Sequence, residues 1–200
     1  MKEPRVPQTQ LAQRYWHQLL TRGADDEPAA RGFALDATAG NGNDALKLAE
    51  WIGPEGRVWA FDVQAAAIYV TDQRLRSAGL RERVELIHSD HADWPRQLPP
   101  AMRGKLDLVV FNLGFLPKSD SRQTTLSNST LKALDPVPEW LRPGGMLSVL
   151  CYPGHAEGAE ETVAVKRWIR KHRSDFASWV QHIPLGRKTP PPELHVLVKR

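Results

Sequence analysis

Glycine and asparagine alternate in the stretch LDATAGNGNDAL, at Gly40, Asn41, Gly42 and Asn43. Glycine lets a backbone turn tightly and approach a ligand closely, because no Cβ stands in the way. Asparagine weakens a helix interior but caps the start of a helix well, so Asn41 or Asn43 is a candidate cap for the segment that follows. The pattern indicates a strand-to-helix turn that binds a ligand through its backbone and amide groups.

Polar side chains also stand at the ends of four predicted strands, at Asp36, Asp62, Asp90 and Asn112. In an open α/β sheet, ligands bind in the crevice beyond the carboxyl ends of the strands. Asp62 lies 20 residues beyond Gly42, about the offset at which an acidic residue binds ribose hydroxyls. Asp36 is placed to accept a hydrogen bond from an ammonium group.

Alternating strands and helices must position these residues. Apolar runs of strand length predict strands at 32–36, 57–63, 84–90, 106–114, 146–154, 179–185 and 194–200. Apolar residues at helical spacing predict helices at 9–20, 43–52, 65–78 and 157–173. Gly79 is a predicted C-cap, and a helical region at 125–141 is expected to break near Pro136 and Pro138.

This alternation implies a mostly parallel α/β sheet with helices on both faces. The last two strands have no helix between them, so we expect a C-terminal hairpin that adds an antiparallel strand. Five parallel strands and a terminal hairpin resemble the Rossmann-like layout of class I methyltransferases that use S-adenosylmethionine. We therefore predict a seven-stranded sheet of this class in a single domain, 1–200, whose residues 1–31 form an N-terminal helix and loop.

The segment FNLGFLP follows the fourth strand and predicts an acceptor site. Its placement resembles the Asn-Pro-Pro-aromatic segment of amino-group methyltransferases. By that likeness, the Asn112 side chain and the Leu113 carbonyl accept hydrogen bonds from a target amine, and Phe115 packs on the base. Such acceptors aim the nitrogen lone pair, which is the main contribution a protein can make to this transfer. The alternative is a strand-end turn with Phe115 in the core.

Three further residues near strand ends are candidates. Ser89 or Asp90 is placed to bind an adenine amine, with His91 beside it. His155, after the fifth strand, faces the same crevice and is a candidate to contact the acceptor or take a proton. For either histidine, a polar surface residue is the simpler alternative. Cys151 is expected in the core.

Two other interpretations of the glycine turn stay open. It is either an ordinary capped turn or part of a dinucleotide site, since Gly40, Gly42 and Ala45 fit G-x-G-x-x-A. The DATAG lead-in, the terminal hairpin and the FNLGFLP segment count against the dinucleotide site.

DATAGNGND, FDVQ, FNLGFLP, the two threonines at 124–125 and YPGH-x-x-G-x-x-E together resemble one family. It is the family of small single-domain class I methyltransferases described as ribosomal RNA methylases. Members act as the transfer RNA 5-aminomethyluridine methyltransferase at the wobble position. The resemblance runs from about Leu35 to Arg200.

The resemblance implies S-adenosylmethionine as cofactor and no metal. The predicted cofactor-site residues are Asp36, Thr38, Gly40, Asn41, Gly42, Asn43, Asp62, Gln64, Ser89, Asp90 and His91. The predicted catalytic residues are Asn112, Leu113, Gly114 and His155. The predicted substrate-binding residues are Phe115, Thr125 and Arg187.

Composition is that of a globular protein: 200 residues, 41% hydrophobic, 25% charged and a net charge of +4. The single cysteine excludes an internal disulfide framework and a cysteine-rich zinc site. The first ten residues lack the apolar core of a signal peptide, and no apolar run approaches the roughly 20 residues of a membrane helix. We expect a cytoplasmic protein.

The expected partner is the anticodon stem-loop of transfer RNA, with a homodimer left open. Basic residues crowd the predicted helix 157–173, where they suit either phosphate contacts or a solvated face. Alternative functions are methylation of a ribosomal RNA base or a small amine, a nicotinamide-dependent oxidoreductase, and a non-catalytic RNA-binding module.

Overall fold

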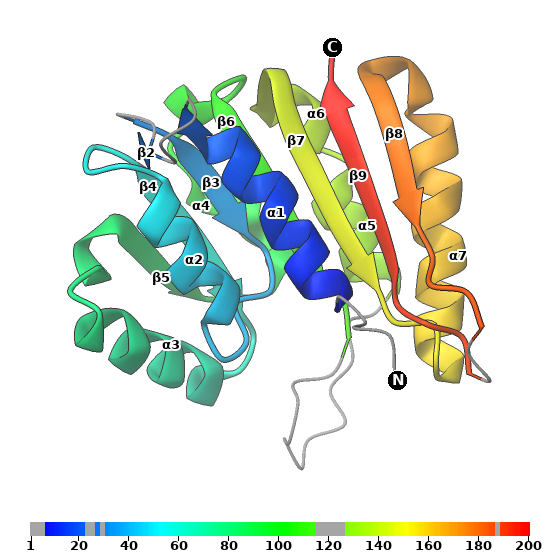
Figure 1. Cartoon of the computed structure of the whole chain (residues 1–200), viewed down its shortest axis with the longest axis horizontal. Coiled ribbons are helices and arrows are strands. Elements are labelled where there is room, and N and C mark those ends of the chain that lie inside the picture. Colours follow the sequence, from blue (N-terminus) through cyan, green and yellow to red (C-terminus); the bar gives the residue numbers. More distant parts are fainter. Residues whose placement is uncertain (1–6, 23–26, 29–30, 115–126, 187–188) are drawn as a thin grey trace, which may run out of the picture.

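The computed structural model describes residues 7–22, 27–28, 31–114, 127–186 and 189–200. Seven strands form one sheet in the order β5-β4-β3-β6-β7-β9-β8 (Figure 1). Their bounds are β3 Phe33–Asp36, β4 Arg57–Asp62, β5 Val84–His88, β6 Leu106–Asn112, β7 Leu141–Cys151, β8 Phe176–His182 and β9 Glu193–Lys199.

The first five of these strands are parallel, and β9 is antiparallel to both of its neighbours, β7 and β8. The predicted fold class is therefore confirmed, including the terminal hairpin and its one antiparallel strand. The reason is the short β8–β9 connection, which has no room for the crossover that a parallel pair needs.

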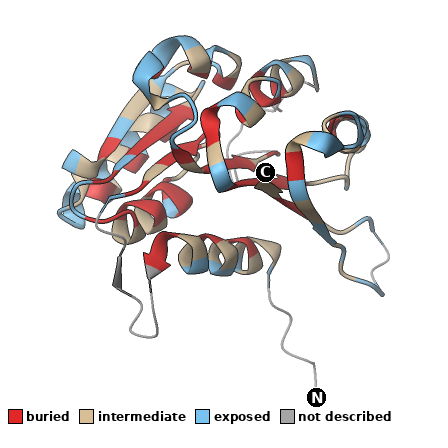
Figure 2. Ribbon diagram, turned by 90° about the horizontal axis from the view of Figure 1, so that it is seen from above, coloured by how far each residue is buried: buried red, intermediate tan, exposed pale blue. Residues whose placement is uncertain are grey.

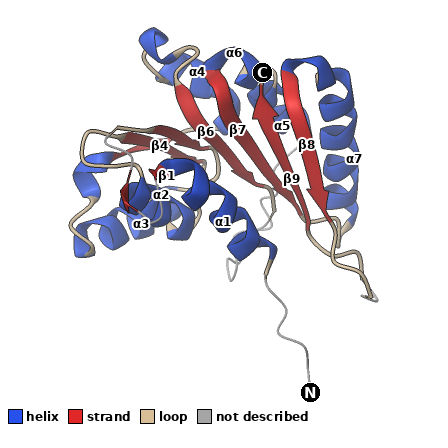
Figure 3. Ribbon diagram, turned by 45° about the horizontal axis from the view of Figure 1, so that its top comes forward, coloured by secondary structure: helices blue, strands red, loops and turns tan. Residues whose placement is uncertain are grey.

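Helices cover both faces of the sheet (Figure 3). Their bounds are α1 Gln8–Leu20, α2 Asn43–Trp51, α3 Ala65–Ser77, α4 Trp94–Gln97, α5 Ser127–Leu134, α6 Val137–Trp140 and α7 Ala156–Lys171. Short 3₁₀ turns lie at η1 Arg81–Arg83, η2 His91–Asp93, η3 Pro100–Met102 and η4 Arg173–Asp175. Gly79 follows α3 with a φ of 69°, as its predicted role requires, and the helical region does break before Val137.

Two apolar clusters, one on each face, make the core (Figure 2). One packs α1, α2 and α3 on the sheet through residues such as Trp16, Leu48 and Leu75. The other packs α4 to α7 through residues such as Trp94, Trp140 and Ile169. Burial on both faces explains why the strands read as nearly continuous apolar runs.

Some predicted bounds were wrong. β7 begins at Leu141 and not at 146, because Leu141 pairs with Leu106 before an irregular step in the register. A Cβ on Gly145 would lie 2.8 Å from the Leu106 carbonyl oxygen, so only glycine allows the two backbones this close. β8 begins at Phe176, three residues before the prediction. In the predicted N-terminal loop, β1 Thr21–Arg22 pairs with β2 Glu27–Pro28.

Among the residues that the structure describes, no helix is both long enough and apolar enough to cross a membrane.

Leu197 and Leu185 offer a matched pair of substitutions. Leu197 is fully buried on β9, whereas Leu185 is 91% exposed. We expect Leu197→Ala to lower the free energy of unfolding by about 2–5 kcal/mol, because it leaves a cavity in the core. We expect Leu185→Ala to change it by about 0.5 kcal/mol or less. Urea unfolding of both variants measures this; equal losses would contradict the assigned core.

Candidate active site

Strand register brings the polar strand ends to one level. Asp36 pairs with Ala60 on β4 and with Val110 on β6. Asp62 and Asn112 stand two residues beyond these partners, so they end their strands at the same level, on either side of β3. The turn after β3 joins them, because the Asn112 backbone N–H donates to Oγ1 of Thr38 at 2.8 Å.

The glycine turn is held against the end of β4. The N–H of Gly40 donates to Oδ2 of Asp62 at 2.8 Å, and the N–H of Gln64 donates to Oδ1 at 2.9 Å. The carbonyl of Gly40 accepts from Oγ1 of Thr71 at 3.0 Å. Asp62 therefore fixes the turn and the start of α3, and each of its oxygens keeps lone pairs for further donors.

Gly42, and not an asparagine, occupies the N-cap of α2. The helix begins at Asn43, so the cap position falls one residue earlier, where φ is 73° and no side chain caps the helix. A Cβ on Gly42 would lie 2.7 Å from Oγ1 of Thr71. The prediction that Asn41 or Asn43 caps the helix was wrong, because close packing of the turn on α3 requires glycine at that position.

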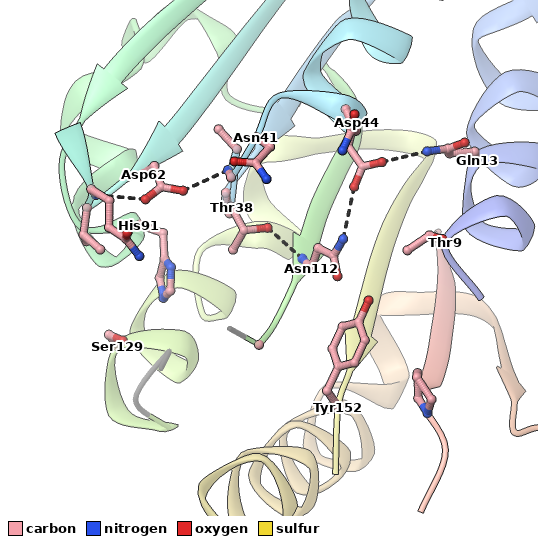
Figure 4. Close-up of a pocket in the computed structure, with 18 of the residues that line it drawn as sticks. Thr9, Gln13, Thr38, Asn41, Asp44, Asp62, His91, Asn112, Ser129 and Tyr152 are labelled. Carbon is pink, nitrogen blue, oxygen red and sulfur yellow. Dashed lines mark hydrogen bonds between the residues drawn. The ribbon is translucent and has the colours of Figure 1, made fainter. Parts of the chain in front are cut away.

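A cavity of about 940 Å³ opens beyond these strand ends (Figure 4). Eleven of the predicted site residues line it: Thr38, Gly40, Asn41, Asn43, Asp62, Gln64, Asp90, His91, Asn112, Gly114 and His155. Residues predicted for the cofactor site and residues predicted for the methyl-acceptor site therefore line one cavity.

Four predicted residues do not line the cavity. Gly42 is packed on α3, and Leu113 is fully buried with its N–H donating to the Leu150 carbonyl at 2.8 Å. Ser89 is half-buried beside Asp90, and Asp36 is fully buried. Phe115, Thr125 and Arg187 lie outside the described residues.

Asp36 is a fully buried carboxyl. Its Oδ1 accepts from the Thr38 N–H at 3.0 Å, and its Oδ2 has no partner among the described residues. Burial, and then the nearby charge of Asp44, raise the pKa of Asp36 to about 8. The carboxyl is therefore mainly protonated near neutral pH.

Asp90 and His91 lie at the far wall of the cavity. The Asp90 side chain is exposed and accepts from the Ala92 N–H at 2.8 Å, so it caps η2. His91 is buried edge-on to Phe111, and burial lowers its pKa, which favours the neutral ring. Nε2 of His91 is buried, lies 4.0 Å from Oδ1 of Asp90, and has no hydrogen-bond partner among the described residues.

Asn112 lines the cavity, and a hydrogen bond to Asp44 holds its side chain. Nδ2 of Asn112 donates to Oδ2 of Asp44 at 3.2 Å, and Nε2 of Gln13 donates to Oδ1 of Asp44 at 2.8 Å (Figure 4). Tyr152 also lines the cavity, and its ring lies so close to Gly114 that a Cβ there would be 3.0 Å from it.

His155 has a structural role as well as a place in the cavity wall. Its Nδ1 accepts from the Gly158 N–H at 3.1 Å, so the side chain caps α7.

Several lining residues were not predicted: Thr9, Gln10, Gln13, Ala37, Ala39, Asp44, Val63, Ser129, Tyr152, Gly154, Pro190 and Pro192. Asp44 carried a signal, because an acidic residue in the first turn after a glycine loop stands at a ligand-facing helix end. Tyr152 stands two residues beyond Leu150, which pairs with Asn112. No sequence pattern pointed to Gln13, since the contact between α1 and the carboxyl ends of the strands arises only in the tertiary structure.

The basic residues of α7 stand largely away from the cavity. α7 begins beside the cavity at His155 and is 16 residues long, so Arg170 and Lys171 lie roughly 20 Å away along the helix axis. Lys166 is paired with Glu193 at 2.5 Å. These residues therefore form a surface separate from the cavity mouth.

The family model described as "Putative rRNA methylase" matches residues 58–198 of this chain. The chain belongs to this family. It is a family of methyltransferases that use S-adenosylmethionine, which decides against the oxidoreductase interpretation of the glycine turn.

Individual relatives agree with this assignment. A chloroplastic tRNA (mnm5s2U34)-methyltransferase of Arabidopsis thaliana is 35% identical over 166 residues, which are 79% of this chain and 57% of that protein. The chain spans about half the length of the curated relatives it matches.

Two solved structures have the same fold over their whole length. A Clostridium thermocellum protein, described like the family, has a TM-score of 0.87 and 29% identity, and the match covers 98% of this chain and 100% of that one. A methyltransferase-class protein of Streptococcus mutans, solved in complex with SAH, has a TM-score of 0.80 and 27% identity, with 98% and 99% covered.

The buried carboxyl of Asp36 predicts a specific pH dependence. Its pKa is about 8 in the folded protein and near the ordinary value of 3.8 in the unfolded chain, so between these values the folded protein binds more protons. The free energy of unfolding therefore falls with rising pH, relative to Asp36→Asn, by at most about 1.4 kcal/mol per pH unit.

The difference in free energy of unfolding between the unmodified protein and Asp36→Asn is constant below the pKa of Asp36 in the unfolded chain. It is constant again above the pKa of Asp36 in the folded protein. Urea unfolding of both proteins at intervals from about pH 5 to about pH 9 checks this. A difference that does not vary with pH would mean that Asp36 is ionised in the fold.

Proposed function

We propose that the chain transfers a methyl group from S-adenosylmethionine to the amine nitrogen of 5-aminomethyluridine at the wobble position of transfer RNA. The product is 5-methylaminomethyluridine. The observation that carries the proposal is the shared cavity, in which the Asp62–Gly40 turn and the Asn112 side chain face one space. A donor and an acceptor bound there would lie side by side.

The residues present fit the cofactor. Asp62 keeps lone pairs for ribose hydroxyls, and His91 lines the same cavity, where its ring is placed to contact the adenine. We assign Thr38, Gly40, Asn41 and Gln64 to the same site because they line the cavity beside Asp62. When bound, S-adenosylmethionine supplies an electrophilic methyl group.

The acceptor end of the cavity suits an amine. Oδ1 of Asn112 is a hydrogen-bond acceptor, because Nδ2 is already committed to Asp44. We infer that Oδ1 accepts an N–H group of the amine and aims its lone pair at the donor. The role predicted for the Leu113 carbonyl stays a prediction, because Leu113 does not line the cavity. The Tyr152 ring lines the same cavity and is placed to pack on the uracil base. Positioning of this kind lowers the barrier without a protein nucleophile.

The choice of transfer RNA rests on the Arabidopsis relative and on the motifs of the sequence. The partner we propose is the anticodon stem-loop, whose wobble base would be turned out of the loop into the cavity. The cytoplasmic location expected from the sequence belongs to the same proposal.

Nucleoside mass spectrometry tests the proposal. Purified protein and S-adenosylmethionine would be incubated with transfer RNA from cells that lack this gene, and with ribosomal RNA and free 5-aminomethyluridine in parallel. The proposal predicts a gain of one methyl group on 5-aminomethyluridine in transfer RNA. Methylation of ribosomal RNA alone, or equal methylation of the free nucleoside, would contradict it.

Asn112→Ala should separate catalysis from cofactor binding. We expect the variant to lose at least about 100-fold in kcat, because the amine is no longer aimed, and to bind S-adenosylmethionine within about 3-fold of the unmodified protein. Calorimetric titration and single-turnover assays measure the two effects. A large loss of cofactor affinity with normal kcat would reverse the assigned roles.

A further inference from the structure

Asp44 joins two parts of the chain that the strand–helix repeat does not bring together. It is the second residue of α2 and is 8% exposed. One oxygen accepts from Gln13 on α1 and the other accepts from Asn112 at the end of β6. A single carboxylate thus uses both oxygens to hold two side-chain amides (Figure 4).

The chemistry of these groups fixes the direction of each hydrogen bond. An ionised carboxylate only accepts, so each amide must turn its NH₂ group toward Asp44. The amide of Asn112 then has Oδ1 as its remaining polar atom. In the opposite orientation Asn112 would present N–H donors, which could bond only to the lone pair of a neutral amine and would occupy the pair that must attack the methyl group.

Two amide donors stabilise the ionised form of Asp44 against burial. Burial raises the pKa of Asp44 above its ordinary value, and the hydrogen bonds from Gln13 and Asn112 offset part of that rise. The neighbouring acids Asp36 and Tyr152 have pKa values raised by burial to about 8 and about 12, so both are mainly neutral near pH 7.

We propose that Asp44 is a positioning residue for methyl transfer: it orients the Asn112 amide so that Oδ1 accepts from the substrate amine, and Gln13 holds Asp44 in place. This inference rests on the proposed function, because the amine is the group that the oriented Oδ1 would bind. It also gives α1, which precedes the strand–helix repeat, a part in the reaction.

Two double variants test the direction of the hydrogen bonds. In Gln13→Glu with Asp44→Asn, residue 13 can only accept, so the new amide at position 44 turns its oxygen to Asn112 and keeps the working orientation. In Gln13→Lys with Asp44→Asn, residue 13 can only donate, so the amide at position 44 turns its NH₂ group to Asn112 and Asn112 must flip.

We call the Gln13→Lys, Asp44→Asn variant the lysine pair and the Gln13→Glu, Asp44→Asn variant the glutamate pair. We expect the lysine pair to have a kcat at least about 10-fold below that of the glutamate pair, with cofactor affinities within about 3-fold of each other. Gln13→Lys alone, with Asp44 retained as acceptor, should keep a kcat above that of the lysine pair, which separates the added charge from the flip. Glu50→Gln is the matched control: it is the same kind of change on α2, in a carboxylate paired with Lys47, and should leave activity unchanged.

Side-chain amide NMR gives a readout that does not require substrate. The Nδ2 proton of Asn112 that is hydrogen-bonded to residue 44 should exchange slowly with solvent in the unmodified protein and in the glutamate pair. It should exchange fast in the lysine pair, where the NH₂ group faces the open cavity.

Equal kcat in the two pairs, or equal exchange of the Asn112 amide, would overturn the role of Asp44 while leaving the function intact. If the unmodified protein methylates no 5-aminomethyluridine, the proposed function fails. The exchange data still decide then whether Asp44 orients Asn112.

Discussion

Strand register is the constraint on which the site depends. Asp62 and Asn112 belong to strands that are not neighbours, and β3 lies between them. They meet the same cavity because β4 and β6 pair with β3 at one level. Side chains alternate between the two faces of a strand, so a slip of one residue in β6 would turn Asn112 to the opposite face. The apolar clusters on both faces of the sheet oppose such a slip.

Hydrogen bonds beyond the strand ends convert this register into a fixed site. Asp62 holds the glycine turn, Thr38 holds the backbone of Asn112, and Asp44 holds its side chain. These contacts are all made between groups of the protein itself, so the fold supplies the proposed acceptor geometry. For a reaction whose electrophile comes with the cofactor, this preorganisation is the part that the protein supplies.

Much of this arrangement could be predicted from the sequence, because it depends on local patterns. Apolar runs and helical spacing gave the order of the strands and helices, and the polar strand ends pointed to Asp62 and Asn112. The glycines at 40 and 42 correctly indicated a tight turn, although the cap was assigned to the wrong residue. Bounds were less accurate where glycine allows irregular pairing, as at the start of β7.

The residues that were missed depend on tertiary contacts. Gln13 lies 31 residues before Asp44, and only the packing of α1 on the sheet brings them together. Tyr152 lines the cavity because β7 pairs with β6. It is the first residue of the YPGH motif, in which a role was predicted only for the histidine. Asp36 was predicted to accept a hydrogen bond from a ligand, and in the fold it is fully buried and does not line the cavity.

The central claim is that one cavity holds the methyl donor at the Asp62 side and the acceptor amine at Asn112. A crystal structure with S-adenosylhomocysteine and an anticodon stem-loop containing 5-aminomethyluridine tests this most directly. The account predicts the aminomethyl nitrogen within about 3.2 Å of Oδ1 of Asn112, facing the sulfur of the cofactor product. A wobble base outside this cavity, or an amine bound away from Asn112, would contradict it.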